Sequence, residues 1–359
     1  MAAPAADRGW LHDADLAAQK SNEAVAVAAE KCADDTKGQT CYICTEALHW
    51  KTKEGLVRMC SCRGTAGFVH VSCLAEQAKI LVAEAEENNL DWKVRDARWK
   101  RWYSCSLCEQ RYQGVVQCAL GWACWKTYVG RPEGNVARSL AMTSLGNGLS
   151  AAEHHEDALT VREAELAMKR RLGASEASIL VVQGNLGNLY DKLGRLEQAL
   201  QMRQDAYSGH LKFYGEEHED TVRTANNYAA SLYNLQSFEE AKLLLRRTVP
   251  VARRVFGDDH RLTLSLGWMY AMALYLDEGA TLDDTIESVN TLEELERTAR
   301  RVLGGAHPLT TAMEDNLRQA RAALREEVRE EARTRGAAII YAAAALAVAA
   351  VLVLRKKLT

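Results

Sequence analysis

The chain has 359 residues, of which 48% are apolar and 26% are charged, and its formal net charge at pH 7 is −3. This length allows two or three domains with packed cores. The near-neutral charge argues against a protein that coats nucleic acid, which needs an excess of lysine and arginine. Only four prolines and four phenylalanines occur, while alanine, leucine, glutamate and arginine crowd the second half, so we expect a mainly helical fold.

Residues 1–36 contain no apolar run of signal-peptide length and no clear core pattern. Their alanine-rich and charged composition predicts a mobile arm with a weak helix over residues 16–31. All ten cysteines follow or overlap this arm, between Cys32 and Cys124. A secreted disulfide scaffold would spread its cysteines through a small domain behind a signal peptide, so this cluster indicates a metal site in a reducing compartment.

Eight candidate metal ligands occur as four pairs within residues 37–113. In chain order the pairs are Cys41 and Cys44, Cys60 and Cys62, His70 and Cys73, and Cys105 and Cys108. A closed structural zinc site takes four nitrogen or sulfur donors in a tetrahedron, so eight ligands suffice for two zinc ions. The interleaved order predicts a cross-brace, in which the first and third pairs share one ion and the second and fourth pairs share the other. Metal binding would supply about 10 kcal/mol or more of folding free energy per ion.

The segments CYICTE, CSCRGTAGFVHVSCL and CSLCEQRY resemble the RING-CH, or RING-variant, zinc finger over about 70 residues. The matching positions outside the ligands are Gly64, Val69, Leu74 and Tyr112. A PHD finger is the alternative, because it shares the order of four cysteines, one histidine and three cysteines. The short spacing between the second pair of cysteines and the seven residues before His70 fit RING-CH better. The three cysteines outside the pattern are expected to be small buried residues or free thiols.

This resemblance implies ubiquitin ligase activity. A RING performs no covalent chemistry, so we expect no catalytic residue; it holds a ubiquitin-conjugating enzyme and positions the ubiquitin thioester near a substrate lysine. By family position, Ile43 would contact the conjugating enzyme. Two positions depart from the family pattern, which usually has tryptophan at Gln77 and, in many active RINGs, a basic residue at Glu109. The alternative function is therefore a non-catalytic zinc-finger and repeat scaffold.

The 31 residues between Cys73 and Cys105 predict a helix, AEQAKILVAEAEE, and then a tryptophan-rich basic stretch. Trp92, Trp99 or Trp102 could replace the missing aromatic of the family. The interpretation that we favour is that they close the small core of the finger, because aromatic side chains mostly supply buried area. Residues 114–136 then predict one amphipathic connector helix that docks the finger onto the helical repeats.

Residues 137–312 contain an internal repeat. Gly173, Gly215 and Gly257 lie 42 residues apart, and Gly304 follows after 47. A glycine, a histidine and a threonine recur together at three of these positions, with the histidines at His218, His260 and His307. A fixed period with paired helices is typical of an α-solenoid, in which the glycine ends one helix and the histidine and threonine begin the next unit. We expect these histidines to form joints between units rather than a metal site.

The repeats resemble tetratricopeptide repeats of the 42-residue kind found in kinesin light chains. Four units are expected, at 137–178, 179–220, 221–262 and 263–312, followed by a polar capping helix at 313–335. The resemblance implies a concave groove for a protein or peptide substrate, in which asparagines clamp the peptide backbone; the candidates are Asn185, Asn188 and Asn227, with Asn147 as a weaker match. Alternatively, these asparagines are only exposed polar residues of the helices.

Residues 337–354 form an uninterrupted apolar run, AAIIYAAAALAVAAVLVL. As a helix this run spans about 27 Å, close to the ~30 Å hydrocarbon core of a bilayer, so it predicts a transmembrane helix. A buried or self-associating soluble helix is the alternative. The run resembles a tail anchor of the mitochondrial outer membrane or the endoplasmic reticulum, with the N-terminal domains in the cytosol. The expected fold is thus mainly α: a cross-brace zinc finger, an α-solenoid of helical hairpins and a C-terminal transmembrane helix.

Overall fold

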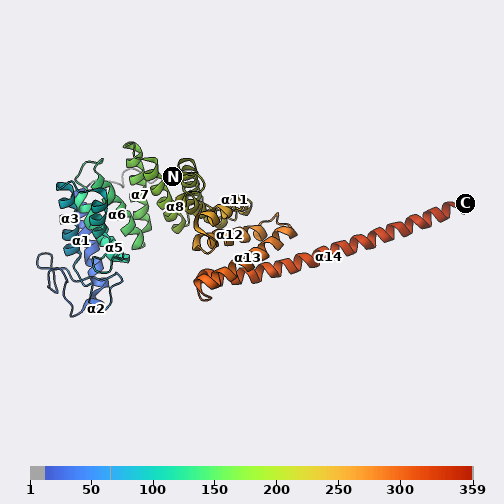
Figure 1. Ribbon diagram of the computed structural model, residues 1–359, viewed down its shortest axis with the longest axis horizontal. Coiled ribbons are helices and arrows are strands. Elements are labelled where there is room, and N and C mark those ends of the chain that lie inside the picture. Colours follow the sequence, from blue (N-terminus) through green and yellow to red (C-terminus); the bar gives the residue numbers. More distant parts are fainter. Residues whose placement is uncertain (1–12, 65, 358–359) are drawn as a thin grey trace. The chain divides into compact units, whose positions relative to one another are not determined.

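The computed structural model describes residues 13–64 and 66–335, and it continues the last helix as backbone to Lys357. Within this part of the chain the secondary structure is helical, apart from two isolated antiparallel bridges, Val57–Val69 and Ser104–Arg111. The chain divides into two compact units, Met1–Met202 and Arg203–Thr359. Figure 1 labels their helices in chain order. A mainly helical fold is therefore confirmed.

The first unit begins with an ordered helix, α1 (Ala14–Lys31), followed by the short α2 (Ala33–Thr36). The Asp13 carboxylate caps α1 by accepting the backbone N–H groups of Asp15 and Leu16. Helix α1 packs against α5 (Gly114–Tyr128), and Ala17 and Ala28 are fully buried. The described part of the expected mobile arm is thus a packed helix. Its small alanine side chains allow close packing but give only a weak hydropathy pattern, which explains the difference.

The zinc-finger region consists of loops that precede and follow α3 (Val71–Glu87), α4 (Trp92–Trp99) and the single 3-10 turn η2 (Lys100–Trp102). Trp99 and Trp102 are buried against Tyr128 of α5, with ring centroids 5.4 and 5.8 Å from it. Trp92 is 72% exposed. The core-closing interpretation is therefore confirmed for Trp99 and Trp102, although the core that they close is shared with the connector helix.

The connector helix α5 joins the finger to the first helical hairpin, α6 (Val136–Ala151) and α7 (His155–Arg171). It ends at Tyr128, earlier than the expected boundary. Two glycines allow α5 and α6 to approach closely: a Cβ on Gly121 would lie 2.9 Å from the Ser144 carbonyl oxygen, and one on Gly148 would lie 2.7 Å from the Gln117 carbonyl oxygen. The finger and the first hairpin consequently belong to one compact unit, which also contains α8 (Glu176–Lys192).

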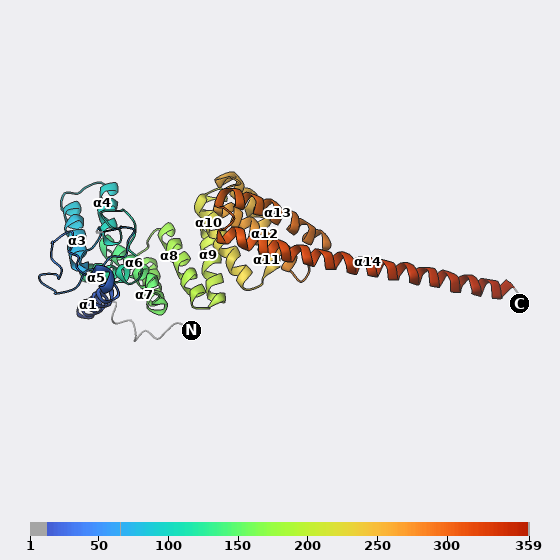
Figure 2. The ribbon, with the colours of Figure 1, turned by 90° about the horizontal axis from the view of Figure 1, so that it is seen from below.

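Helix α9 (Leu196–Tyr214) spans the boundary between the units, and the second unit continues with further antiparallel hairpins. Its helices are α10 (Glu219–Asn234), α11 (Phe238–Phe256), α12 (Arg261–Leu276), α13 (Leu282–Leu303) and α14 (Pro308–Lys357). Successive helices of this unit pack side by side (Figure 2). The start of α14 covers α12 and α13 with the buried side chains of Met313, Leu317 and Ala320, as expected for a capping helix.

The repeat joints have one shared construction. Glycine adopts positive φ at Gly215, Gly257 and Gly304, with angles of 83°, 88° and 88°, a conformation that L-residues avoid. Three residues later, the Nδ1 atom of each repeated histidine accepts the backbone N–H two residues ahead, at 3.1–3.2 Å. His218 and His260 also stack on the aromatic residue that closes the preceding helix. The expected joint role of the histidines is confirmed.

The apolar run at residues 337–354 lies in the part of α14 whose side chains are outside the described residues. Among residues 13–64 and 66–335, no helix is both long enough and apolar enough to cross a membrane. The expected transmembrane helix is therefore taken up below as a proposal.

Candidate metal centre

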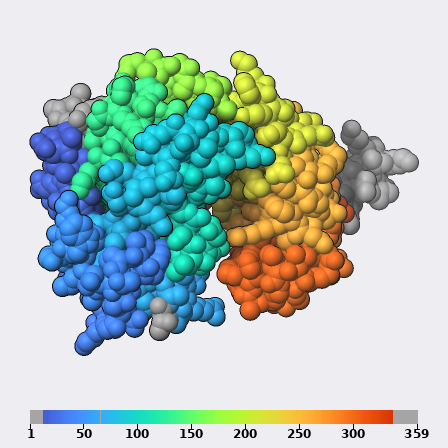
Figure 3. Space-filling view, turned by 60° about the vertical axis from the view of Figure 1, so that its left-hand side comes forward, coloured from blue at the N-terminus to red at the C-terminus, as the bar shows by residue number. Residues whose placement is uncertain are grey.

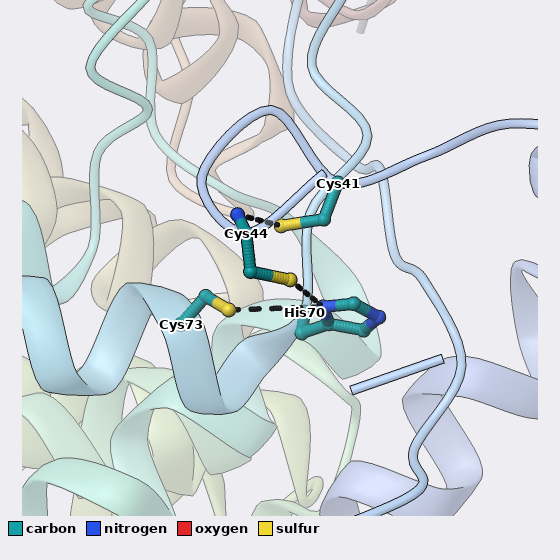
Figure 4. Close-up of side chains that lie close together, drawn as sticks. All are labelled: Cys41, Cys44, His70 and Cys73. Atoms are coloured by element: carbon teal, nitrogen blue, oxygen red, sulfur yellow. Dashed lines mark hydrogen bonds between the residues drawn. The ribbon is translucent and has the colours of Figure 1, made fainter. Parts of the chain in front are cut away.

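The first ligand cluster joins a loop to the start of α3. The donor atoms of Cys41, Cys44, His70 and Cys73 all lie within 4.8 Å of one another. His70 Nδ1 is 3.3 Å from Cys44 Sγ and 3.7 Å from Cys73 Sγ. Figure 4 shows these side chains pointing toward one common space. Four soft donors at this spacing fit a tetrahedral zinc ion.

The second cluster gathers four thiols from segments that are far apart in sequence. The sulfur atoms of Cys60, Cys62, Cys105 and Cys108 lie within 4.8 Å of one another, and Cys62 and Cys105 are separated by 3.8 Å between sulfurs. Gly67, with a φ of 88°, lies directly against this cluster. A Cβ there would be 2.7 Å from Cys62 Cβ and 3.0 Å from its sulfur, so only glycine leaves room for the thiol. The pairs predicted from the interleaved sequence order are the pairs that the fold brings together.

Two turns of the same shape carry the first and last ligand pairs. In the first turn, Cys41 Sγ accepts the backbone N–H groups of Ile43 and Cys44 at 3.4 and 3.5 Å. In the last turn, Cys105 Sγ accepts the N–H of Leu107 at 3.4 Å. Hydrogen bonds from amides to sulfur favour the thiolate form, which is the form that binds metal. The residue after each pair adopts positive φ, 65° at Thr45 and 56° at Glu109.

The imidazole of His70 is oriented from both sides. It is fully buried, its Nδ1 faces the sulfurs, and its Nε2 lies 3.4 Å from the carbonyl oxygen of Ala47. A carbonyl oxygen can only accept a hydrogen bond, so the proton is placed on Nε2 and Nδ1 keeps the lone pair that a metal ligand needs. Burial also lowers the pKa of His70, which favours the neutral ring.

The surroundings of the thiols raise the pKa of some cysteines and lower the pKa of others. Burial raises the pKa of Cys60 to about 11, and it raises the pKa of Cys62 and Cys73 further. Burial also acts on Cys108, but backbone hydrogen bonds from Gln110 and Ser61 outweigh it and hold the pKa of Cys108 at about 7. Crowded thiols cannot all ionise on their own, whereas a divalent cation among them stabilises the thiolates together. This donor chemistry fits zinc.

The Tyr42 side chain links the two turns, because its hydroxyl lies 3.1 Å from the Ser106 hydroxyl of the last turn. The residue after each of them is apolar and exposed: Ile43 by 38% and Leu107 by 52%. Our sequence reasoning selected Ile43 and missed Leu107. Both residues occupy the second position between paired cysteines, so the symmetry of the two pairs was the signal that could have found it.

The structure shows the surroundings of Gln77 and Glu109, the two positions that depart from the family pattern. Gln77 is half-buried on α3. The Glu109 carboxylate forms an ion pair with Arg101 at 2.9 Å, and Arg101 also donates to the carbonyl oxygen of Cys105 at 3.3 Å. A positive charge thus lies close to the last ligand pair, although the residue directly after it is acidic.

The candidate peptide-binding asparagines lie in both units, with Asn185 and Asn188 on α8 and Asn227 on α10. Asn188 is exposed, and the other two are half-buried. The weaker match, Asn147, has its side-chain oxygen occupied by a 2.5 Å hydrogen bond from Arg162. That oxygen is therefore engaged inside the hairpin and is not open to a peptide.

Sequence reasoning missed the buried charge network around that bond. Arg162 and Glu165, both on α7, are 2% and 1% exposed and form an ion pair of 2.5 Å. Thr143 Oγ1 donates to Glu165 at 2.6 Å. Gly146 leaves room for the Arg162 side chain, because a Cβ at position 146 would lie 2.8 Å from Arg162 Nε. A glycine inside an otherwise helical segment was the available signal.

Comparison with known proteins gives separate matches for the finger and for the repeats. The family model described as RING-variant domain matches residues 41–108, and the model described as tetratricopeptide repeat matches residues 175–254. Clustered mitochondria protein homologs from Aspergillus fumigatus and Aspergillus niger are 26% identical over 117 residues, which is 33% of this chain. The chain spans 9% of the length of these curated relatives.

Comparison with solved structures also gives matches. The kinesin light chain nearly identical TPR-like repeats of Podosopora anserina have 17% sequence identity and a TM-score of 0.44, covering 65% of this chain and 97% of that one. BtubC (BKLC) from P. vanneervenii has 15% identity and a TM-score of 0.36, covering 71% and 92%. By the family models that match them, residues 41–108 of this chain belong to the RING-variant domains, a zinc finger of the ubiquitin-ligase type, and residues 175–254 belong to the tetratricopeptide repeats, which serve protein interactions.

Proposed function

We propose that the chain is a ubiquitin ligase whose finger binds a ubiquitin-conjugating enzyme and whose repeats recruit a protein substrate. The observation that carries this proposal is the pair of matched turns, each of which exposes one apolar residue, Ile43 or Leu107, on a frame that contains two ligand clusters. Such a frame acts by positioning: it holds the charged conjugating enzyme so that the thioester meets a substrate lysine. No side chain of this chain needs to enter the chemical step.

Two zinc ions are the cofactors in this proposal, one in each cluster. Cys41, Cys44, His70 and Cys73 would hold the first ion, and Cys60, Cys62, Cys105 and Cys108 would hold the second. Zinc in a closed site of this kind has a structural role, because no coordination position remains open for a substrate. Its contribution is to fix the loops that carry the two exposed apolar residues.

The proposed binding surface is small, so each apolar anchor has a large share of the binding energy. Truncating an interface isoleucine or leucine to alanine removes about 1–2 kcal/mol of apolar burial, which weakens binding by roughly 5- to 30-fold. We therefore expect Ile43→Ala and Leu107→Ala each to reduce ubiquitin-chain formation strongly while both metal clusters remain intact.

The test is an autoubiquitination assay of the zinc-loaded full chain with a panel of conjugating enzymes. The variants are Ile43→Ala, Leu107→Ala and, as a matched control, Val136→Ala, whose side chain is 72% exposed at the start of α6. The proposal predicts chains with the wild type and the control and a strong loss with the two finger variants. Equal activity of all four proteins, with zinc content unchanged, would contradict the proposed surface.

The second part of the proposal assigns substrate recruitment to the repeats, with Asn185, Asn188 and Asn227 as backbone clamps for an extended peptide. Selection of peptides from a random library on the full chain tests it. Alanine at these three positions should abolish enrichment while autoubiquitination stays at the wild-type level. Enrichment that persists in the triple variant would rule out the clamp role.

We further propose that residues 337–354 anchor the chain in the mitochondrial outer membrane or the endoplasmic reticulum, with the finger in the cytosol. Support comes from the uninterrupted apolar sequence of this run. Alkaline extraction of membranes from cells that express the chain tests this: the full chain should stay with the membrane, and a chain with arginines at two central positions of the run should be released.

A non-catalytic scaffold is the second candidate function, and Gln77 is the observation that favours it. The half-buried glutamine stands where RING-CH members usually carry tryptophan, so the surface for the conjugating enzyme would lack one large apolar contact. A chain that binds zinc and selects peptides but forms no ubiquitin chains with any conjugating enzyme would support the scaffold.

A further inference from the structure

A third turn of the zinc finger has the shape of the two ligand-bearing turns but carries no cysteine. It covers residues 48–54 and is called here the Trp50 turn. The His49 N–H donates to the Glu54 carbonyl oxygen at 3.0 Å, and the Lys53 N–H donates to the His49 carbonyl oxygen at 2.9 Å. His49 Nδ1 accepts the Thr52 N–H at 3.1 Å, in the way that the cysteine sulfurs accept amides in the other turns. Lys53 adopts a positive φ of 59°.

The Trp50 turn is fixed firmly to the finger. The Glu54 carboxylate accepts hydrogen bonds from the backbone N–H and the hydroxyl of Ser72, both at 2.7 Å. His49 is 8% exposed, and its ring meets the ring of His70 edge-on with centroids 5.4 Å apart. These contacts orient the outer side of the turn without the help of any partner.

That outer side combines large apolar and cationic side chains. Trp50 is 68% exposed and Leu48 is 58% exposed, although tryptophan is a residue that proteins usually bury. Lys51 and Lys53 are exposed, and neither forms an ion pair with any residue of the described ranges. The nearby acidic groups are Glu46, which is exposed, and the inward-facing Glu54. Figure 3 shows the first part of the finger, residues 37–64, at the surface of the molecule in blue.

We propose that the Trp50 turn is a membrane contact, in which Trp50 and Leu48 enter the headgroup region of an anionic bilayer and the two lysines meet acidic lipid headgroups. Tryptophan prefers the bilayer interface because its ring is amphipathic. Each lysine close to an anionic leaflet strengthens binding by about fivefold. This contact depends neither on ligase activity nor on insertion of residues 337–354.

The backbone of the turn is compatible with the headgroup region of a bilayer. The N–H groups of His49, Thr52 and Lys53 are satisfied inside the turn, and those of Trp50 and Lys51, which have no hydrogen-bond partner among the described residues, would be satisfied by water and lipid oxygens in that hydrated region. The unpaired Lys51 and Lys53, which follow the exposed Trp50, match an anionic lipid surface, because such a surface offers many acidic headgroups rather than one acidic residue.

The test is hydrogen–deuterium exchange of the zinc-loaded full chain with two kinds of vesicle: phosphatidylcholine alone, and a 4:1 mixture of phosphatidylcholine and phosphatidylserine. Attachment through residues 337–354 and their basic flanks is common to the wild type and to the lysine variant described below, so the comparison of these two proteins separates it from the contact of the Trp50 turn. The proposal predicts that the peptide covering residues 48–53 exchanges at least about fivefold more slowly with phosphatidylserine than without it. The segment around Val136, whose side chain is 72% exposed but which contains no tryptophan or lysine, is the internal control and should not change.

The double variant Lys51→Glu with Lys53→Glu should lose the phosphatidylserine effect while keeping its zinc content and its autoubiquitination in solution. Equal exchange of residues 48–53 with both vesicles would overturn the proposal. So would protection of this peptide only when a conjugating enzyme is added, because the turn would then be a protein interface. Loss of ligase activity with the lipid effect retained would instead count against the proposed function alone.

Discussion

Substituting Gly67 with alanine tests whether the second cluster is a metal site. Gly67 has a φ of 88°, and an added Cβ would lie 2.7 Å from Cys62 Cβ. Carbon atoms in contact normally stay about 3.5–4.0 Å apart, so Cys62 must move by roughly 1 Å. A zinc–sulfur bond tolerates only about 0.2 Å. The positive φ adds roughly 1–3 kcal/mol of backbone strain.

Gly64→Ala is the matched control. Gly64 also has positive φ, at 63°, but a Cβ added there would meet no atom within 4 Å, so this change introduces strain of about 1–2 kcal/mol without a clash. Zinc per chain, measured by atomic emission after dialysis against a weak chelator, should be two for Gly64→Ala and one for Gly67→Ala, because the first cluster does not touch Gly67. Two tightly held ions in Gly67→Ala would refute the reasoning.

Three further predictions concern packing. Arg162→Met should lower the free energy of unfolding by about 3–5 kcal/mol, because the buried Glu165 loses its close ion-pair partner and keeps only Lys169, at 3.8 Å, and adding Glu165→Met should restore part of this loss in urea denaturation. His260→Ala should cost about 1 kcal/mol in the same assay through the lost helix cap, whereas His260→Asn, which keeps an acceptor, should cost less. Trp102→Ala should destabilise the chain by about 3–5 kcal/mol and Trp92→Ala by under about 0.5 kcal/mol, as thermal melting would show.

The candidate metal centre was predictable because cysteine spacing has a direct geometric meaning. A cross-brace fixes which ligand pairs meet, so the sequence order alone assigned all eight residues to two groups. The repeat period likewise predicted the hairpins and their joints. Gly257 and His260 are typical of the three later joints, which share the same positive φ and the same helix cap.

Other features could not be predicted, because they depend on contacts between residues that are distant in the sequence. The burial of α1 depends on the neighbouring helix α5, and alanines such as Ala17 and Ala28 carry little hydropathy signal. The ion pair of Arg162 and Glu165 looks in sequence like an ordinary charged pair on a helix surface, and its burial depends on the missing side chain of Gly146. The exposure of Trp50 depends on the hydrogen bonds of a turn, and amino-acid composition does not indicate such a turn.

The central claim is that eight side chains of the finger hold two metal ions and thereby shape its loops. Zinc content of the purified full chain, measured together with thermal unfolding before and after a strong chelator, tests it most directly. Our account predicts two zinc ions per chain, and a finger that loses its cooperative unfolding transition when both are removed. A chain that is purified without zinc and still unfolds cooperatively at the same temperature would contradict the account.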